Sequence, residues 1–309
     1  MNRFLISLFF VIYLFSSSLK AIDIITEVVS NFNASQKQSA RAEAYGNLFI
    51  NYEEPDKFLA NLQYEFKDQE HRLNVVSVKF SLGMADISIG RQLFAWGTGY
   101  NFNPTDIFNA KPLGAAFDPT YIKTGRDAVM LTVYPMDNTS LDVILAPQFN
   151  RSDTFDQQVV TQSGTEDFGL RLKTNLFDYD VAITYTSLGE RTYNSNGHKN
   201  DNLYGLAVKG SLPIYDIGVW LEAVKYYYQQ KYEVTVGLEY FYESLVFNLE
   251  YYKNNWGKKD KSSYDENLLL ASQVLAQEYV IPSIACYLDE KTTFTVFDFH
   301  NLNDKSNIL

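Results

Sequence analysis

Cysteine and histidine are both scarce in this sequence. Cys286 is the one cysteine among 309 residues, so a disulfide within the chain and a cysteine-based metal cluster are both excluded. The three histidines, His71, His198 and His300, lie far apart along the chain. None stands in a recognisable constellation with a serine or aspartate, whereas a hydrolase such as a lipase needs a nucleophile, a base and an orienting group together. The sequence therefore predicts no enzyme and no catalytic residue.

Basic residues are outnumbered by acidic ones. Lys and Arg total 26 against 37 Asp and Glu, which leaves a formal net charge of -11. Nucleic-acid binding depends on clustered Lys and Arg that neutralise phosphates, so this class of function is excluded. The chain also lacks a phosphate loop, a zinc-ligand spacing and a nucleotide-binding motif, and we expect neither a cofactor nor a metal.

Long apolar runs are missing beyond the N-terminus, so we expect no transmembrane helix. At the N-terminus, Arg3 is followed by an apolar run over residues 4–15, and small residues then occupy positions 16–18 and Ala21. This order is typical of a secretory signal peptide, and the run is short for the alternative, a helical membrane anchor. We therefore expect a signal peptide at residues 1–21 and a single domain over residues 22–309.

Aromatic side chains are abundant, with 23 Tyr and 22 Phe. A soluble core rarely needs so many Tyr, because every buried hydroxyl requires a partner. A membrane barrel places them in two interfacial girdles, where the ring lies in lipid and the hydroxyl in water. An aromatic-rich β-sandwich is the alternative that the composition leaves open.

Apolar and polar residues alternate along most of the chain. In one segment, Ala60, Leu62 and Tyr64 alternate with Asn61 and Gln63. This period of two predicts β-strands with one apolar and one polar face, and about ten residues is the length that a tilted strand needs to cross a bilayer. The alternating segments include residues 57–67, 166–176, 179–187, 231–242 and 244–255.

The connections between these segments alternate in length. Outer-membrane barrels sort their connections in this way, with short turns in the periplasm and long loops outside, whereas a soluble sandwich has no reason to do so. Two links on the long-loop side, residues 68–70 and 229–230, are short exceptions. Short turns are expected at residues 53–56, 83, 135–138, 177–178, 213–216 and 243. Longer loops are expected at residues 97–123, 150–165, 189–201 and 256–267.

The sorted connections give a strand count. Residues 22–32 and 41–52 become the first two strands, residues 269–284 the fourteenth and residues 292–301 the fifteenth, with an external loop from residue 300 onward. Single-chain bacterial barrels have an even number of strands. The odd count therefore leaves two alternatives: the chain stops one strand short of a sixteen-strand barrel, or one strand boundary is misplaced.

One segment carries a recognisable motif. It reads Gly90-Arg91-Gln92, Trp96-Gly97-x-Gly99 and Asn103-Pro104-x-Asp106, followed by Phe117-Asp118-Pro119 and Gly125-Arg126-Asp127-Ala128. This arrangement resembles a broad group of porin-like outer-membrane β-barrel proteins of Gram-negative bacteria. The resemblance covers the whole chain in layout and residues 90–128 in motif. It implies an all-β, antiparallel transmembrane barrel in the outer membrane and implies no particular substrate.

Arg91 poses a problem for a strand in a membrane. The apolar face of Ala85, Ile87 and Ile89 would, if continued, direct Arg91 into lipid at a cost of roughly 2–4 kcal/mol. We therefore predict a β-bulge at Gly90 that turns Arg91 into the lumen.

The loop that follows is expected to fold into the lumen. Its Asn-Pro and Asp-Pro pairs favour turns, and Asp106 is suited to cap a short helix. Two interpretations of its charges are open: a channel constriction, or a buried salt-bridge staple that fixes the loop, which is the simpler and favoured one. The residues concerned are Arg91, Asp106, Asp118, Arg126 and Asp127. The other charges on polar strand faces, Glu222 and Glu250 among them, are interpreted as facing water.

These observations lead to one main functional hypothesis and its competitors. The leading hypothesis is a channel for passive diffusion of small polar solutes, with outer-membrane lipid as the surrounding partner. The first alternative is a plugged barrel with a structural or surface-binding role and no channel activity. The second is a soluble β protein of the periplasm. The sequence names no solute and does not decide whether the chain forms a homo-oligomer.

Overall fold

The structure is a computed structural model in which every regular element of the described residues, except one short turn of helix, is a β-strand. The expected signal peptide at residues 1–21 lies outside the described residues. No helix in the described part is long and apolar enough to cross a membrane. The described residues are 22–33, 41–54, 57–67, 70–109, 125–147, 166–189, 201–213, 215–264, 275–289 and 292–308.

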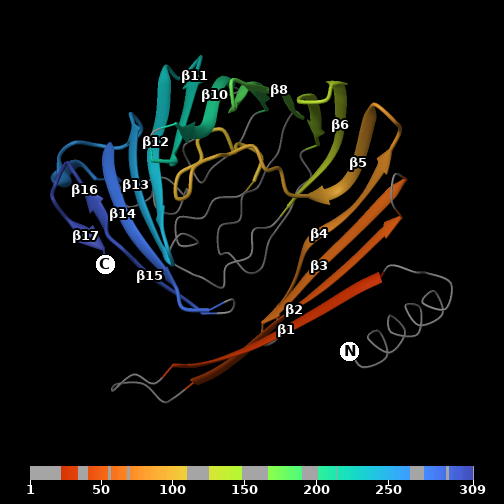
Figure 1. The fold of residues 1–309 in the computed structure, drawn as a ribbon, viewed down its shortest axis with the longest axis horizontal. Helices are drawn as coiled ribbons and strands as arrows, with labels where there is room; N and C mark the ends of the chain where they lie inside the picture. Colours follow the sequence, from red (N-terminus) through yellow and green to blue (C-terminus); the bar gives the residue numbers. More distant parts are fainter. Residues whose placement is uncertain are drawn as a thin grey trace.

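The strands follow one another around a single curved sheet, with β1 and β17 at opposite edges (Figure 1). They are β1 Ile22–Asn33, β2 Arg41–Glu54, β3 Phe58–Lys67, β4 Glu70–Ser81, β5 Ala85–Gln92, β6 Arg126–Met136, β7 Thr139–Ala146, β8 Asp167–Leu176 and β9 Tyr179–Leu188. The second half holds β10 Asp201–Leu212, β11 Ile217–Tyr226, β12 Lys231–Tyr242, β13 Leu245–Asn254, the 3-10 turn η2 Lys261–Ser263, β14 Glu278–Tyr287, β15 Thr293–Phe297, β16 Phe299–Asn301 and β17 Asn307–Ile308.

Every strand from β1 to β14 pairs antiparallel with its neighbour in sequence. Strand β14 then pairs with both β15 and β16, so these two are halves of one passage interrupted at Asp298. Strands β1 to β14 and this passage make up the expected fifteen, and the two-residue β17 follows as a further strand. Among the described residues, no pairing joins β1 to the strands at the other edge of the sheet.

Two expected boundaries near the C-terminal end were wrong. Strand β14 begins at Glu278, because residues 275–277 bond to the preceding loop instead: Lys258 N–H donates to the Leu275 carbonyl at 2.9 Å. Residues 269–274 of the expected strand lie outside the described part. The expected external loop from residue 300 is instead a tight turn, after which β17 pairs antiparallel with β16.

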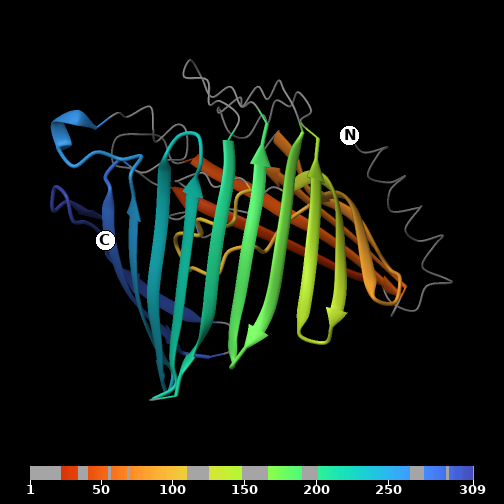
Figure 2. The ribbon, with the colours of Figure 1, turned by 90° about the horizontal axis from the view of Figure 1, so that it is seen from above.

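Side chains alternate between the two faces of the sheet as the sequence predicts. On β6, Val129 and Leu131 are 42% and 36% exposed, whereas their neighbours Ala128 and Thr132 are buried. The exposed apolar face lies on the outside of the curve, and the inside holds the buried residues. Figure 2 shows the strands side by side, with a segment of the chain running through the interior behind them.

The predicted bulge at Gly90 was wrong. The β4–β5 and β5–β6 registers pass through Gly90 without a shift. The bulge lies one strand away, where Gln63 and Tyr64 face Val75 and Leu73 and leave Asn74 as the extra residue. Asn74 is fully buried, and its carbonyl accepts the Gly125 N–H at 2.8 Å. The irregularity therefore brings the start of β6 onto β4, just where β5 ends.

Glycine is required at position 90 for a different reason, the conformation and close packing of its backbone. Its φ is +116°, and a Cβ built there would lie 2.3 Å from the Val76 carbonyl oxygen. Both observations require glycine, because other residues are strained at this φ and the obstacle is main chain rather than a movable side chain. Gly90 thus allows the chain to leave the sheet after Gln92.

We expect Gly90→Ala to lower the free energy of unfolding by about 1–3 kcal/mol, the cost of a strained backbone position. Gly218→Ala is the matched control, because its Cβ would meet the Glu239 side chain at an ordinary 3.4 Å. Urea unfolding in detergent micelles measures the difference. Equal unfolding midpoints for the two variants would contradict this account of Gly90.

Candidate constriction loop and cavity

Residues 93–109, here called the inward loop, leave the sheet after β5 and lie inside the curve of strands (Figures 1 and 2). The base of the loop is apolar: Phe94, Trp96 and Phe108 are buried against Ile144 and neighbouring alanines of β6 and β7. The base is also closed by Asn109, whose side chain bonds to both the N–H and the carbonyl of Phe94. Burial of three aromatic rings and this closure hold the loop in the interior.

Glu222 of β11 holds the middle of the inward loop. Its carboxylate accepts the N–H groups of Thr98, Gly99 and Thr105, the last two at 2.7 and 3.0 Å, and it lies within 2.9 Å of both threonine hydroxyls. The side chain is completely buried. Successive backbone N–H groups form a concavity that binds an anion, and here the anion belongs to the barrel wall. Charge-assisted hydrogen bonds of this kind are the strong ones.

Glu250 of β13 holds the next stretch of the loop. It accepts the N–H groups of Tyr100 and Phe102, each at 2.9 Å, that of Asn101 at 3.2 Å, and the indole N–H of Trp220 at 3.3 Å. Glu250 is also completely buried. Among the described residues, neither Glu222 nor Glu250 has a cationic side chain within salt-bridge distance. The backbone of the loop therefore supplies the compensation that these two buried charges require.

Gly99 lies between the segments that the two carboxylates bind. A Cβ at this position would lie 2.2 Å from the Phe102 carbonyl oxygen. Only glycine allows the chain to turn back this closely. The turn lets residues 98–99 donate to the Glu222 carboxylate and residues 100–102 to the Glu250 carboxylate. The second glycine of the Trp96-Gly97-x-Gly99 motif thus has a structural explanation.

The tip of the loop reaches the far wall through aromatic contacts. The ring of Phe102 stacks on Tyr252 of β13, with centroids 3.8 Å apart, and lies near Tyr279 and Phe299. Tyr100 donates its hydroxyl to Glu239 of β12. Burial, followed by the hydrogen bond to Glu239, raises the pKa of the Tyr100 hydroxyl above its ordinary value, so it stays protonated as a donor.

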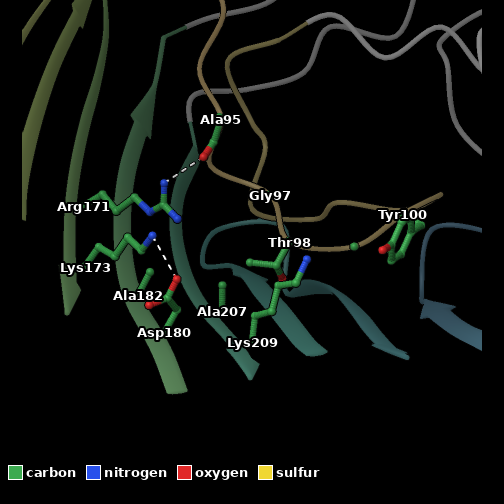
Figure 3. A pocket seen from close by; sticks show the side chains of 11 residues that line it. Ala95, Gly97, Thr98, Tyr100, Arg171, Lys173, Asp180, Ala182, Ala207 and Lys209 are labelled. Carbon is green, nitrogen blue, oxygen red and sulfur yellow. Dashed lines mark hydrogen bonds and ion pairs between the residues drawn. The ribbon is translucent and has the colours of Figure 1, made fainter. Parts of the chain in front are cut away.

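A cavity of about 370 Å³ separates the middle of the loop from strands β8 to β10 (Figure 3). The wall contributes four charged side chains: Arg171 and Lys173 of β8, Asp180 of β9 and Lys209 of β10. Small inward residues leave the space, since Ala182 and Ala207 stand opposite each other in the β9–β10 register. The other lining residues are Ala95, Gly97, Thr98, Gly99 and Tyr100 of the loop.

The charges that the motif singled out do not line this cavity. Arg91 and Asp127 bind each other through two hydrogen bonds of 2.9 and 3.0 Å, and Arg91 also donates to the Leu73 carbonyl at 2.8 Å. Asp127 lies between the inward residues Arg126 and Ala128, so the pair occupies the outward face. The expectation that Arg91 faces the lumen was therefore wrong. The pair instead bridges β4 and β6 where β5 turns away.

Two other charged residues of the motif, Arg126 and Asp106, form contacts in the interior. Arg126 forms a buried salt bridge with Asp167 and lies over the Phe108 ring at 5.8 Å from the centroid. Asp106 is buried and accepts the Asn109 side chain at 2.5 Å. It caps no helix, because residues 101–109 form only turns and irregular chain. Asp118 lies outside the described residues. Arg126 and Asp106 thus support the loop, and the structure does not place them on the cavity surface.

The sequence interpretation missed the residues that hold the loop. Glu222 and Glu250 were expected to face water, and both are fully buried. Arg171, likewise, is only 6% exposed and donates to the Ala95 carbonyl at 3.0 Å. A signal was present in β11, where the polar-face neighbours of Glu222 are the apolar Trp220 and Val224. Apolar residues on an inward face indicate that something covers that face.

The chain was then compared with known proteins. It matches no protein-family model and no curated protein sequence. In three dimensions it is similar to a mutant of the Rh. blastica porin, with a TM-score of 0.55 and 11% identity over 93% of this chain and 96% of the porin. It is also similar to a triple mutant of the Rhodopseudomonas blastica porin, with a TM-score of 0.54 and 11% identity over 91% of this chain and 95% of the porin. The chain has a porin fold.

A further similar structure is described as "Asymmetric conductivity of engineered proteins", with a TM-score of 0.54 and 11% identity over 93% of this chain and 96% of that one. At this level of identity the likeness concerns the fold alone. No group of three or more His, Cys, Asp or Glu residues in the described part is arranged to hold a metal ion.

We expect Glu222→Ala to speed amide hydrogen exchange at Thr98, Gly99 and Thr105 by at least about tenfold, since buried donors lose their acceptor at roughly 1–3 kcal/mol each. Exchange at the Tyr100–Phe102 amides should change less, and Glu250→Ala should show the reverse pattern. Exchange measured on the protein in detergent micelles tests both.

Glu278→Ala is the control for this experiment, because Glu278 bonds Lys253 at 2.6 Å and does not contact the loop. It should leave exchange in the inward loop unchanged. Loop amides that exchange equally slowly in all three variants would show that the carboxylates do not hold the loop.

Proposed function

We propose that this protein is an outer-membrane channel for passive diffusion of small polar solutes. The observation that carries the proposal is the polar cavity between the inward loop and the wall of a porin-fold barrel. Backbone amides, a tyrosine and charged side chains line it, which suits hydrated solutes rather than apolar ones. No catalytic arrangement is needed for such a role, and we infer that the protein is a channel rather than an enzyme.

The outer surface supports the membrane location. Its exposed apolar residues follow the outward phase of the strands, as lipid contact requires. Exposed aromatic residues lie at both ends of the sheet: Phe177 and Tyr215 at the short turns, and Tyr227 and Tyr228 at the opposite end. Aromatic side chains at both ends match the two interfacial girdles of a transmembrane barrel. Outer-membrane lipid is therefore the proposed partner of this surface.

A plugged barrel is the second candidate, and one observation favours it. The inward loop is bound along its length, at its base by packed rings, in its middle by Glu222 and Glu250, and at its tip by the Phe102 stack. A segment held this firmly can close a lumen as well as narrow one. The two candidates differ only in whether ions pass the loop.

The channel proposal predicts stepwise ion conductance when the purified protein is inserted into planar lipid bilayers, because water and ions would pass beside the inward loop. The control is a Glu222→Ala, Glu250→Ala double variant, in which the loop has lost both carboxylate partners and conductance should change. If the wild type is silent while the double variant conducts, the barrel is plugged. Silence of both proteins, once folding is verified, would refute a channel altogether.

A further inference from the structure

The cavity beside the inward loop has an excess of positive charge. Its lining holds three cationic side chains, Arg171, Lys173 and Lys209, and the single carboxylate of Asp180. The loop contributes no charged side chain to the lining (Figure 3). This local sign is opposite to that of the whole chain, whose net charge is -11. The cavity is therefore a distinct electrostatic environment within an acidic protein.

Both oxygens of the Asp180 carboxylate already have a partner. One oxygen accepts the Asn175 side chain at 3.1 Å, and the other binds Lys173 Nζ at 3.1 Å. Lys209 stands directly opposite Asp180 in the β9–β10 register, yet its Nζ lies over the Tyr100 ring, 5.6 Å from the centroid. Within the described part of the chain, Lys209 has no carboxylate within salt-bridge distance. The Lys209 ammonium group at the cavity wall thus contacts an aromatic ring but no carboxylate.

Arg171 also has donors to spare. Its side chain is buried, with 6% exposure, and its Nη1 donates to the Ala95 carbonyl. Its Nε is buried without a hydrogen-bond partner among the described residues. A guanidinium offers five N–H donors in a planar fork that matches carboxylate and phosphate oxygens. An oxyanion in the cavity would supply this fork with a further acceptor.

Carboxylates behind the lining do not supply that acceptor. Asp142, Asp106 and Glu222 lie close enough to Arg171 to interact with it electrostatically. Each is engaged elsewhere: Asp142 accepts the Thr132 hydroxyl, Asp106 the Asn109 amide and Glu222 the loop amides. They reduce the positive potential of the cavity, but none of these hydrogen bonds involves Arg171, Lys173 or Lys209.

We propose that this cavity binds a small oxyanion, a solute that carries a carboxylate or phosphate group, through Arg171, Lys173 and Lys209. The proposal rests on the channel function and specifies its solute class. The alanines at positions 182 and 207 make room for the anion, and the loop residues 97–99 cover it from the other side. Lys209 is the most exposed of the three cations and has no carboxylate within salt-bridge distance in the described part, so it contributes most to the selectivity.

The test measures binding of inorganic phosphate, and of succinate in a parallel arm, by calorimetry on the folded protein in detergent. Lys209→Glu changes the charge by two units and should weaken binding by more than roughly fivefold, the factor for one unit charge at about 4 Å in water. Lys209→Gln should give a smaller loss and guards against misfolding of the reversal variant. Lys225→Gln is the matched control, because Lys225 is exposed outside the cavity and bonds Gln230.

Planar-bilayer recordings of the same proteins separate this inference from the channel proposal. Phosphate should reduce chloride conductance of the wild type and do so less in Lys209→Glu. A channel that conducts but binds neither probe, or binds them equally well in both proteins, overturns the oxyanion site and leaves the channel function intact. Binding that depends on Lys209 in a protein that does not conduct establishes the site and refutes the channel.

Discussion

The hydrogen bonds from loop amides to the buried carboxylates of Glu222 and Glu250 are the interaction on which the interior depends. A barrel wall uses its backbone donors and acceptors in its own ladders, so only side chains can bind a segment that crosses the lumen. A carboxylate is well suited to this, because it accepts several hydrogen bonds and donates none. Its burial would be costly without such compensation. Loop and wall therefore each satisfy what the other leaves unpaired.

The position of the cavity follows from the way the loop is held. The large aromatic residues are at its base, where Phe94, Trp96 and Phe108 pack, and at its tip, where Phe102 stacks. The residues in the middle of the loop are small, so mainly backbone atoms face the wall. Opposite this stretch the wall is also small, with Ala182 and Ala207. The cavity lies where both surfaces lack bulk, and its charged wall residues project into the space that results.

The strands were predictable from sequence because a period of two is a local property. The alternation in residues 57–67 and 231–242 predicts these strands without knowledge of the strands they pair with. The turn at Phe177 and Asp178 likewise involves only neighbouring residues. The sorted connections added the topology, since consecutive strands of a barrel pair with each other. The expected boundaries failed where a strand leaves this regular scheme, as at residues 93–96, at residues 275–277 and after β16.

The site was much less predictable, because its contacts join residues that are far apart in the chain. Glu222 follows Thr98 by 124 residues and Glu250 follows Phe102 by 148. Alternation placed both glutamates on the inward face but could not show that a loop covers them. The bulge was predicted at Gly90 because the apolar phase of β5 would direct Arg91 into lipid, whereas the bulge at Asn74 depends on where β6 returns to β4.

The residues of the motif and the residues of the cavity therefore have different roles. Gly90 frees the backbone, Arg91 bridges β4 and β6 through Asp127 and Leu73, and the Gln92 side chain donates to the Ala128 carbonyl at 3.2 Å. All three act where the chain leaves the sheet. The charges facing the solute space come from β8, β9 and β10, which the motif does not include. A change at Lys209 can alter selectivity without disturbing the exit of the loop, because no hydrogen bond in the described structure connects the two.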